Sequence, residues 1–459
     1  MVPCSAALAR CLSELRAHCR GEVLTASEAP LALARDFGGM LERRPALVLR
    51  AACIADVICA LRSAGEHSIS VTTRGAGHSQ SGQGLGAGLV LDMTRLDRIS
   101  EPAVDARLLE VEAGARWQDV LEMSYRRRLV PNALTHALDT TVAGTLSVGG
   151  VGGESFRAGA QVDNVAYLDV ATPDGNIQRC SASEARELFD AVRAGLGQCA
   201  VILRVGYPLR ACGSQLVTRC FAYADAARFL DDVARLARPS ASRRWLAGAI
   251  RPSRRGERLL QLLVAEETEA ANDALPELPA LQCDRELTAT SSPFWQSNGT
   301  RHQFFRVFAN QRSDTTVQPW VEHFFAEGRA LAALEAFLAE DRALLGLGNA
   351  NLMFVRRAEP AAPLLRPKAG ELLLGIGAFA SFPRESRALA AQTMLAYADR
   401  MSAVGGVRYL SGFFGHTTSA AWAGHFGEAW PGFCAAKRRH DPRRLLNPGF
   451  IDWDAVESA

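Results

Sequence analysis

The sequence predicts an α+β protein built from two unlike parts, and two observations lead to this fold class. Up to about residue 208, strand-like runs and helices are mixed and separated by glycine-rich loops. Beyond that point these loops disappear, and long helical segments at 225–236, 328–345 and 385–403 alternate with strand-like runs. A chain of 459 residues is long enough for two or three domains.

The spacing of apolar residues places the individual elements of the first part. Helical spacing predicts helices at 5–20, 54–63, 117–128 and 183–194. Apolar or alternating runs predict strands at 45–50, 68–73, 89–93 and 108–113. The turn TPDG predicts a hairpin that joins 165–171 to 177–180.

The second part is expected to contain strands between its helices. Apolar runs predict these strands at 245–250, 259–265, 352–356 and 372–379. The segment 266–300 is rich in Glu, Pro and Ser and has weak periodicity, so we expect a loop there.

The stretch TTRGAGHSQSGQGLGAG, residues 72–88, is the most informative in the chain. Glycines at this density around His78 let the backbone approach a ligand closely and point N–H groups at an anion. Gly75 and Gly77 fit the dinucleotide fingerprint G-x-G-x-x-G, but Gln80 stands at its third glycine and a strand-like run follows instead of a helix. The sequence therefore excludes a Rossmann-type site here.

A second glycine-rich stretch covers residues 135–159. Its glycines alternate with hydroxyl side chains, a composition that suits a backbone wrapped around a polar ligand. Taken alone, it reads equally well as a turn-rich connector. Because it follows the first loop in the same half of the chain, we predict that the two stretches form opposite walls of one site.

Composition and charge exclude several classes of function. A net charge of +2 and 7% aromatic residues predict neither a nucleic-acid partner nor a membrane surface. The first twenty residues lack an uninterrupted apolar run, and no stretch of about 18 apolar residues occurs, so neither a signal peptide nor a transmembrane helix is expected. Eleven cysteines without a C-x-x-C pair, and histidines without ligand spacing, predict reduced thiols, a cytoplasmic location and no metal.

Several motifs, in order along the chain, match one known family. They are RGAGHSQSGQG, LDMTRL, VAGTLSVGG, GLGQ and the C-terminal WAGHFGEAW with DPRRLLNPG. With these motifs the chain resembles the cytokinin dehydrogenases, members of the vanillyl-alcohol-oxidase/PCMH-type family of FAD-linked oxidoreductases. The resemblance covers roughly residues 40–208 and 405–452 and is weak over 210–400.

The resemblance implies a fold and a cofactor. It implies a PCMH-type FAD-binding domain of two α/β subdomains over 1–208, an inserted α+β substrate cap domain over 209–410, and a C-terminal segment, 411–459, that returns to the FAD domain. It implies FAD bound covalently through His78, since a histidine in a loop that touches the cofactor can act as nucleophile. A second, cysteinyl, bond is not expected because its position falls near Ala137. The residues expected to contact the flavin are Arg74, Gly75, Ala76, Gly77, Ser79, Gln83, Thr141, Gly144, Ser147, Val151, Ile202 and Asn447.

The chain departs from the family pattern in ways that bear on mechanism. The family's catalytic aspartate matches His136, its S-P-G-Q matches the run that starts at Asn447, and its Y-L-P becomes YLSGFFG after Arg408. Neutral histidine, with an unperturbed pKa near 6.5, can serve as a general base. We therefore expect His136 to be the base or an orienting group, with Asp139 and Tyr409 as rival candidates.

The resulting prediction is an FAD-dependent oxidase or dehydrogenase. It would remove a hydride from a C–N or C–O bond of a small organic molecule in secondary metabolism, with molecular oxygen or a quinone as electron acceptor. One alternative is a true cytokinin dehydrogenase that cleaves N6-substituted adenines. Another is a non-catalytic flavin-binding protein, against which the intact loop around His78 argues. The sequence makes no prediction of oligomeric state.

Overall fold

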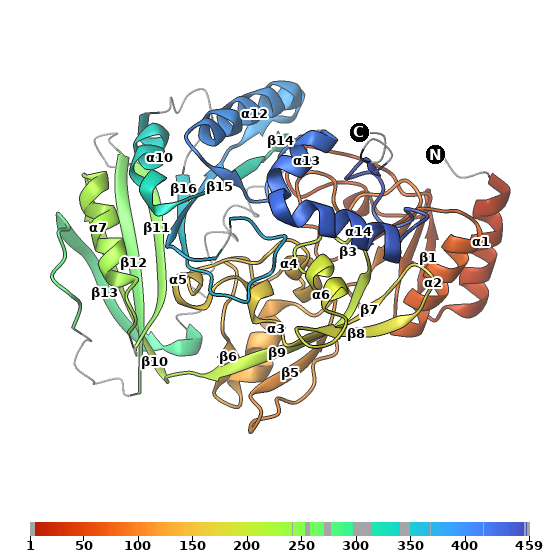
Figure 1. Cartoon of the computed structure of the whole chain (residues 1–459), viewed down its shortest axis with the longest axis horizontal. Coiled ribbons are helices and arrows are strands. Elements are labelled where there is room, and N and C mark those ends of the chain that lie inside the picture. The colour runs from red at the N-terminus through yellow and green to blue at the C-terminus, as the bar shows by residue number, and fades with distance from the viewer. Residues whose placement is uncertain are drawn as a thin grey trace.

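The computed structural model shows three large β-sheets and one short two-stranded sheet, with helices packed around them (Figure 1). It describes residues 5–240, 242–252, 258–269, 277–296, 314–339, 349–367, 369–415, 417–453 and 456. The end of the helix predicted at 328–345, together with His302 and His416, lies outside these residues.

A four-stranded sheet forms near the N-terminus in the order β1-β2-β4-β3. Its strands are β1 (Glu22–Thr25), β2 (Leu47–Arg50), β3 (Val71–Arg74) and β4 (Leu89–Asp92). Strands β2, β4 and β3 run parallel, and β1 is antiparallel to β2. The helices α1 (Ser5–His18) and α2 (Ile54–Glu66) pack beside this sheet with their apolar faces. The glycine-rich loop connects β3 to β4.

The second sheet is antiparallel and centres on the long strand β9 (Val201–Ala211). Its other strands are β5 (Leu108–Glu112), β6 (Leu129–Pro131), β7 (Tyr167–Ala171) and β8 (Ile177–Ser181). The associated helices are α3 (Trp117–Tyr125), α4 (Val142–Leu146), α5 (Ser155–Ala158) and α6 (Arg186–Val192). The second glycine-rich stretch runs through α4 and up to α5.

The largest sheet has eight antiparallel strands in the order β13-β10-β12-β11-β16-β17-β15-β19. The four on one side are β10 (Gln215–Tyr223), β11 (Arg243–Pro252), β12 (Arg258–Thr268) and β13 (Arg285–Pro293). The others are β15 (Trp320–Phe325), β16 (Asn349–Val355), β17 (Leu373–Phe379) and β19 (Val407–Arg408). A separate short pair joins β14 (Thr316–Val317) to β18 (Phe382–Pro383).

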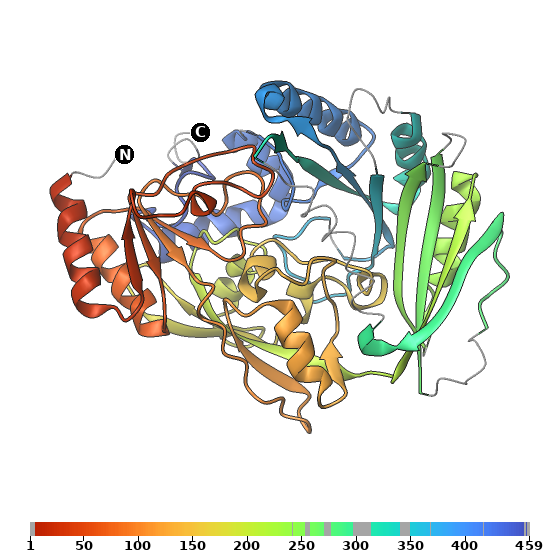
Figure 2. The same ribbon diagram turned by 180° about the vertical axis from the view of Figure 1, so that it is seen from behind.

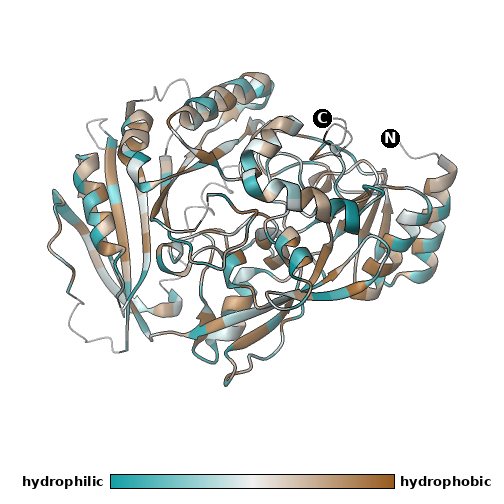
Figure 3. Cartoon of the chain, in the orientation of Figure 1, coloured by the Kyte–Doolittle hydropathy of each residue, from teal (hydrophilic) through white to brown (hydrophobic). Residues whose placement is uncertain are grey.

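Three helices cover the outer face of this sheet (Figure 2): α7 (Ala226–Leu236), α10 (Glu327–Ala339) and α12 (Arg387–Ala403). Alternate strand residues, such as Val321 and Ile376, pack against them in one apolar core. The strand residues between these, such as Phe324 and Met353, face the first part of the chain and join its core. Figure 3 shows the hydrophobic residues concentrated along the strands. The large sheet thus turns its inner face toward the glycine-rich loops.

After β19, the chain returns to the first sheet. Helices α13 (Ser419–Phe426) and α14 (Trp430–His440) precede a parallel bridge between Leu446 and Val71, the first residue of β3. Buried Lys437 holds this return in place: its ammonium group donates to Asp441 (2.7 Å) and to the carbonyls of Gln198 (2.8 Å) and Leu446 (3.1 Å). The C-terminal segment therefore completes the wall around the glycine-rich loops.

Most predicted elements are present, and one expectation is wrong. The segment 266–300 contains the strand β13, which was missed because it is an exposed edge strand whose polar residues give no apolar run. The strands β10 and β15 were also not predicted. None of the described helices is long and apolar enough to cross a membrane.

Candidate active site

One pocket lies between the glycine-rich loops and the inner face of the large sheet. Its empty space is about 1460 Å³, including the part open to solvent. His136 and Tyr409 line it, whereas Asp139 does not. Every residue expected to contact the cofactor lines it: Arg74, Gly75, Ala76, Gly77, His78, Ser79, Gln83, Thr141, Gly144, Ser147, Val151, Ile202 and Asn447.

The two glycine-rich stretches meet at Thr141. A Cβ atom at Gly75 would overlap the Oγ1 of Thr141, so only glycine allows this close approach. Gly77 has a φ of +74°, a backbone conformation that favours glycine, and a Cβ there would overlap the guanidinium of Arg74. The predicted second wall is thus in direct contact with the first loop.

Arg74 stabilises the glycine-rich loop of residues 72–88 through hydrogen bonds to backbone carbonyls. Its guanidinium donates to the backbone carbonyls of Ala32 (2.9 Å), Arg35 (3.1 Å) and Gly84 (3.2 Å). Because its donors meet backbone carbonyls, we interpret Arg74 as a brace for the loop that also borders the pocket.

Glutamine and serine side chains attach the loop to the large sheet and to the segment after β19. The amide of Gln80 donates to Gln318 O (2.9 Å) and accepts from Trp320 N (2.8 Å). Gln83 donates to Leu410 O (2.9 Å), and Ser81 accepts from Phe414 N (3.0 Å). Gln80, the mismatch to the Rossmann fingerprint, is fully buried and links the two parts of the chain.

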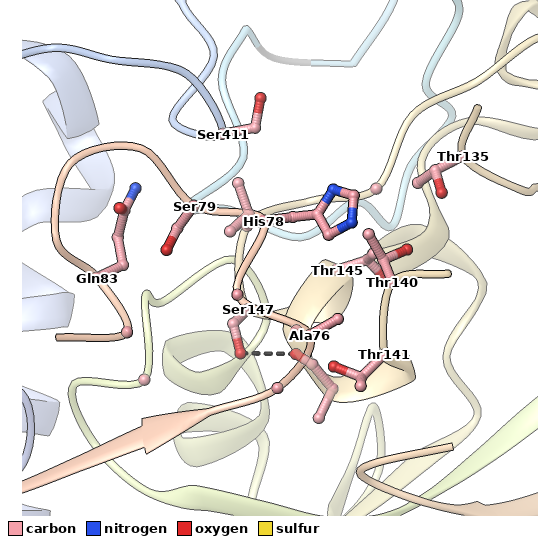
Figure 4. Close-up of a pocket in the computed structure, with 18 of the residues that line it drawn as sticks. Ala76, His78, Ser79, Gln83, Thr135, Thr140, Thr141, Thr145, Ser147 and Ser411 are labelled. Atoms are coloured by element: carbon pink, nitrogen blue, oxygen red, sulfur yellow. Dashed lines mark hydrogen bonds between the residues drawn. The ribbon is translucent and has the colours of Figure 1, made fainter. Parts of the chain in front are cut away.

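His78 lies between an aromatic ring and a carboxylate. Its imidazole stacks on Phe37, with ring centroids 4.4 Å apart, and its Nε2 lies 3.2 Å from Asp139 Oδ2. The hydrogen bond with His78 lowers the pKa of the Asp139 carboxyl, so that group is ionised. In Figure 4, the imidazole lies between Ser411 on one side and Thr140, Thr141 and Ser147 on the other. No local pattern in the sequence indicates this pairing of His78 with Asp139, which lies 61 residues away along the chain.

The other two catalytic candidates occupy different walls. His136 is half-buried, with its ring centroid 5.6 Å from that of Trp245 on β11. Tyr409 is buried, and its hydroxyl accepts from Gly150 N at 2.8 Å. Burial raises the pKa of Tyr409, so its phenol is neutral and a poor base.

Asn447 closes the pocket from the C-terminal segment. It has a φ of +46°, its backbone N–H donates to Val71 O (2.8 Å), and its side-chain amide donates to Gly197 O (2.7 Å). Its Oδ1 is buried and has no hydrogen-bond partner among the described residues. A buried acceptor without a partner indicates that a ligand donor belongs there.

The inner face of the large sheet supplies a wall that sequence reasoning missed. The pocket residues from it are Trp320 and Glu322 on β15, and Asn351 and Met353 on β16. Ser411, which stands where the family pattern Y-L-P has proline, donates a hydrogen bond to Glu322. Burial raises the pKa of Glu322 to about 7, although hydrogen bonding by Ser411 and Trp320 opposes the rise. The sequence feature that could have indicated Glu322 is its position as the one carboxylate in the largely apolar and aromatic run WVEHFF.

Among the described residues, no cysteine lines the pocket, and the cluster of possible metal-ligand atoms lies elsewhere. Ala137 lines the pocket where a cysteinyl bond was considered. The side chains of Glu14, Glu66 and His67 bring possible ligand atoms within 4.8 Å of one another. Glu14 is hydrogen-bonded there to His67 (2.9 Å) and Ser63 (2.5 Å), contacts that explain this cluster as a link between α1 and α2.

Two family models match the chain. The model of the FAD binding domain matches residues 45–181, and the model described as cytokinin dehydrogenase 1, FAD and cytokinin binding, matches residues 386–451. The matched regions contain both glycine-rich stretches and the C-terminal return.

Individual proteins resemble the chain over nearly its whole length. An uncharacterized oxidoreductase, ORF5 in the fasciation locus of Rhodococcoides fascians, is 33% identical over 435 residues, which cover 90% of this chain and 95% of that protein. Cytokinin dehydrogenase 1 of Oryza sativa subsp. japonica is 29% identical over 493 residues, covering 94% and 91% of the two chains. The solved structure of 6-hydroxy-D-nicotine oxidase from Arthrobacter nicotinovorans superimposes with a TM-score of 0.72 at 18% identity, covering 94% of this chain and 97% of that one. That likeness shows a shared fold.

Proposed function

The chain belongs to the cytokinin dehydrogenase-like family of FAD-linked oxidoreductases and has a PCMH-type α+β fold, and on this basis we propose its reaction and the roles of its pocket residues. It is an FAD-dependent oxidase or dehydrogenase of small organic molecules. We propose that it removes a hydride from a C–N or C–O bond while its flavin is tethered to His78. One observation carries this proposal: His78, both glycine-rich stretches and the inner face of the large sheet line a single pocket.

The residues of this pocket fit FAD. The glycine backbone of 75–77 and the hydroxyls of Ser79, Thr141 and Ser147 suit the polar parts of a dinucleotide. The partnerless Oδ1 of Asn447 offers an acceptor for an N–H group. When bound, the flavin supplies a two-electron acceptor for the substrate's hydride.

The geometry around His78 supports a covalent tether. A carboxylate on Nε2 favours the tautomer with its proton on that nitrogen, which leaves the Nδ1 lone pair as nucleophile. Stacking on Phe37 fixes the plane of the ring. Asp139 therefore acts on His78 in this proposal, rather than as the base for the substrate.

His136 is the proposed base for the substrate's proton. It lines the pocket, whereas Asp139 is engaged with His78, and the phenol of Tyr409 accepts a hydrogen bond from Gly150. A neutral imidazole is a residue type that can take up a proton from a substrate. Molecular oxygen or a quinone then accepts the electrons.

We propose two candidate substrate classes for the protein. We favour a small molecule of secondary metabolism because His136 replaces the family's aspartate. Cytokinin dehydrogenase activity on N6-substituted adenines is the second candidate, and the match of residues 386–451 to the cytokinin-binding model favours it. We also propose a cytoplasmic location, which reduced cysteines would suit.

The test is a substrate screen under anaerobic conditions. The protein expressed with ample riboflavin should be yellow, and amines, alcohols and N6-isopentenyladenine are then added singly while flavin absorbance is followed. Bleaching identifies the substrate class. Colourless protein, or yellow protein that no member of the panel bleaches, would contradict the proposed oxidation.

A further inference from the structure

Three arginines lie close together where the glycine-rich part of the chain meets the large sheet. Arg157 stands on α5, Arg210 on β9 and Arg244 on β11. A backbone hydrogen bond from Leu246 N to Gly153 O (2.9 Å) joins the two parts of the chain beside them. None of the three arginines lines the pocket, so the proposed oxidation does not use them.

One carboxylate, that of Glu267 on β12, contacts two of these guanidinium groups. Its side chain is only 6% exposed, and it accepts from Arg210 on both oxygen atoms, at 2.7 and 3.0 Å. It also accepts from Gly213 N at 3.2 Å, and Nε of Arg244 lies 3.5 Å away. Because a carboxylate carries a single charge, its close pair with Arg210 leaves the charge of Arg244 largely unbalanced.

A β-bulge brings Arg244 to this carboxylate. Arg243 pairs with Glu266 on β12 and Trp245 pairs with Ala265, so Arg244 is the extra residue between them. The side chain of Arg243 has its own partners, since it lies 3.5 Å from the carboxylate of Glu266. A bulge changes the direction of a side chain, and here it adds a second arginine to a carboxylate that already has one.

Arg157 adds a third positive charge and is exposed to solvent. Among the described residues, its guanidinium has no hydrogen bond or ion pair. Partial burial of the guanidinium, together with repulsion from Arg244 and Arg210, lowers the pKa of Arg157. The carboxylates of Glu154 and Glu267 favour its charged form but do not offset the shift. Three guanidinium groups thus share two carboxylates, and the cluster has one positive charge in excess.

Two donors of the cluster are buried without a hydrogen-bond acceptor among the described residues. They are Nε of Arg210 and Nε of Arg244, whose 3.5 Å contact with Glu267 is not a hydrogen bond. Buried donors are normally paired, so these two indicate that a ligand acceptor belongs here, and the excess charge indicates an anion. A tetrahedral oxyanion has enough oxygen atoms for several guanidinium groups, whereas a carboxylate has only two.

We propose that Arg157, Arg210 and Arg244 form a binding site for a phosphate group. The guanidinium groups of Arg157 and Arg244 donate to its oxygen atoms, and Glu267 holds Arg210 beside them. The ligand is inorganic phosphate or the phosphate group of a small ester. Once bound, it connects α5 to β11 and stabilises the contact between the two parts of the chain. The inference concerns binding alone and does not depend on the proposed oxidation.

The test is a calorimetric titration of the flavin-containing protein with sodium phosphate and, separately, with glycerol phosphate. Sodium chloride keeps the ionic strength constant, so that screening is the same throughout. The wild type should bind at a single saturable site, and the tighter of the two ligands identifies the free ion or the ester as the preferred form. Arg157→Gln and Arg244→Gln should each weaken binding about 10- to 100-fold, because each removes charge-assisted hydrogen bonds.

Further variants keep the result interpretable at matched flavin content. Arg10→Gln removes an exposed arginine of α1 and should leave the affinity unchanged. Arg157→Lys keeps the positive charge without the planar fork, so it should weaken binding less than Arg157→Gln. The absence of saturable binding of either ligand by the wild type would overturn the inference. So would wild-type affinity in flavin-replete Arg157→Gln and Arg244→Gln.

Discussion

The pocket has two walls of different construction. The wall from residues 72–88 and 135–159, the backbone wall, is rich in glycines and hydroxyls, which suit a cofactor common to the whole family. The wall from β15 and β16, the side-chain wall, presents larger side chains, among them Trp320, Glu322 and Asn351. We interpret the backbone wall as the part that determines cofactor binding. Side chains on the other wall can differ between relatives and so determine substrate specificity. The following variants test this division.

The largest effect is expected for His136, which lies on the cofactor side but is proposed to act on the substrate. His136→Ala should slow flavin reduction by a good substrate about 100- to 10,000-fold, because the general base is lost. Stopped-flow absorbance under anaerobic conditions measures this rate. His18→Ala, at an exposed histidine of α1, is the control. An unchanged rate in His136→Ala with full flavin content would remove His136 from the mechanism.

A smaller effect is expected where the two walls are joined. Gln80→Ala removes two buried hydrogen bonds, to Gln318 and Trp320, and leaves their backbone groups unsatisfied. The free energy of unfolding should fall by about 2–4 kcal/mol in a denaturant titration. Gln178→Ala, on the exposed part of β8, should change it by less than about 0.5 kcal/mol. Equal stability of the two variants would show that contacts other than those of Gln80 hold the two walls together.

The smallest effect is a pH dependence confined to the side-chain wall. Burial raises the pKa of Glu322 to about 7, so its negative charge is lost as the pH falls through 7. The binding of a cationic substrate against this wall should be constant above that pH and weaken about tenfold for each unit below it. Asp36, buried under the glycine-rich loop, also has a pKa raised to about 7 by burial. A profile that persists in Glu322→Gln would assign the titration to Asp36 or another group.

The sequence predicted the backbone wall better than the side-chain wall, for a physical reason. A loop that must approach a ligand needs glycines at close spacing, and these leave a readable pattern around His78. The strand β15 is buried on both faces, so its residues show no alternation that marks a strand. The alignment of Glu322 on β15 with Asn351 on β16, through Gly377 on β17 between them, depends on strand register between distant segments, which no local pattern contains.

The same limit applies to the partners of His78. The glycine pattern predicts the position of His78 in the loop. Asp139 lies 61 residues away along the chain, and the sequence suggests it only as a candidate base. The contact forms because Gly75 and Thr141 bring the two glycine-rich stretches together. Gln80 is a second example. The sequence shows it only as a mismatch to the dinucleotide fingerprint, whereas in the structure its buried side chain hydrogen-bonds to the backbone of Gln318 and Trp320 at the start of β15.

The tether at His78 is the central claim, and the mass of the intact protein under denaturing conditions tests it most directly. The wild type should carry the additional mass of FAD and retain its yellow colour in the acid precipitate. His78→Ala should have the mass of the polypeptide alone and release any flavin into the supernatant. A wild type with the polypeptide mass and a colourless precipitate would contradict the tether.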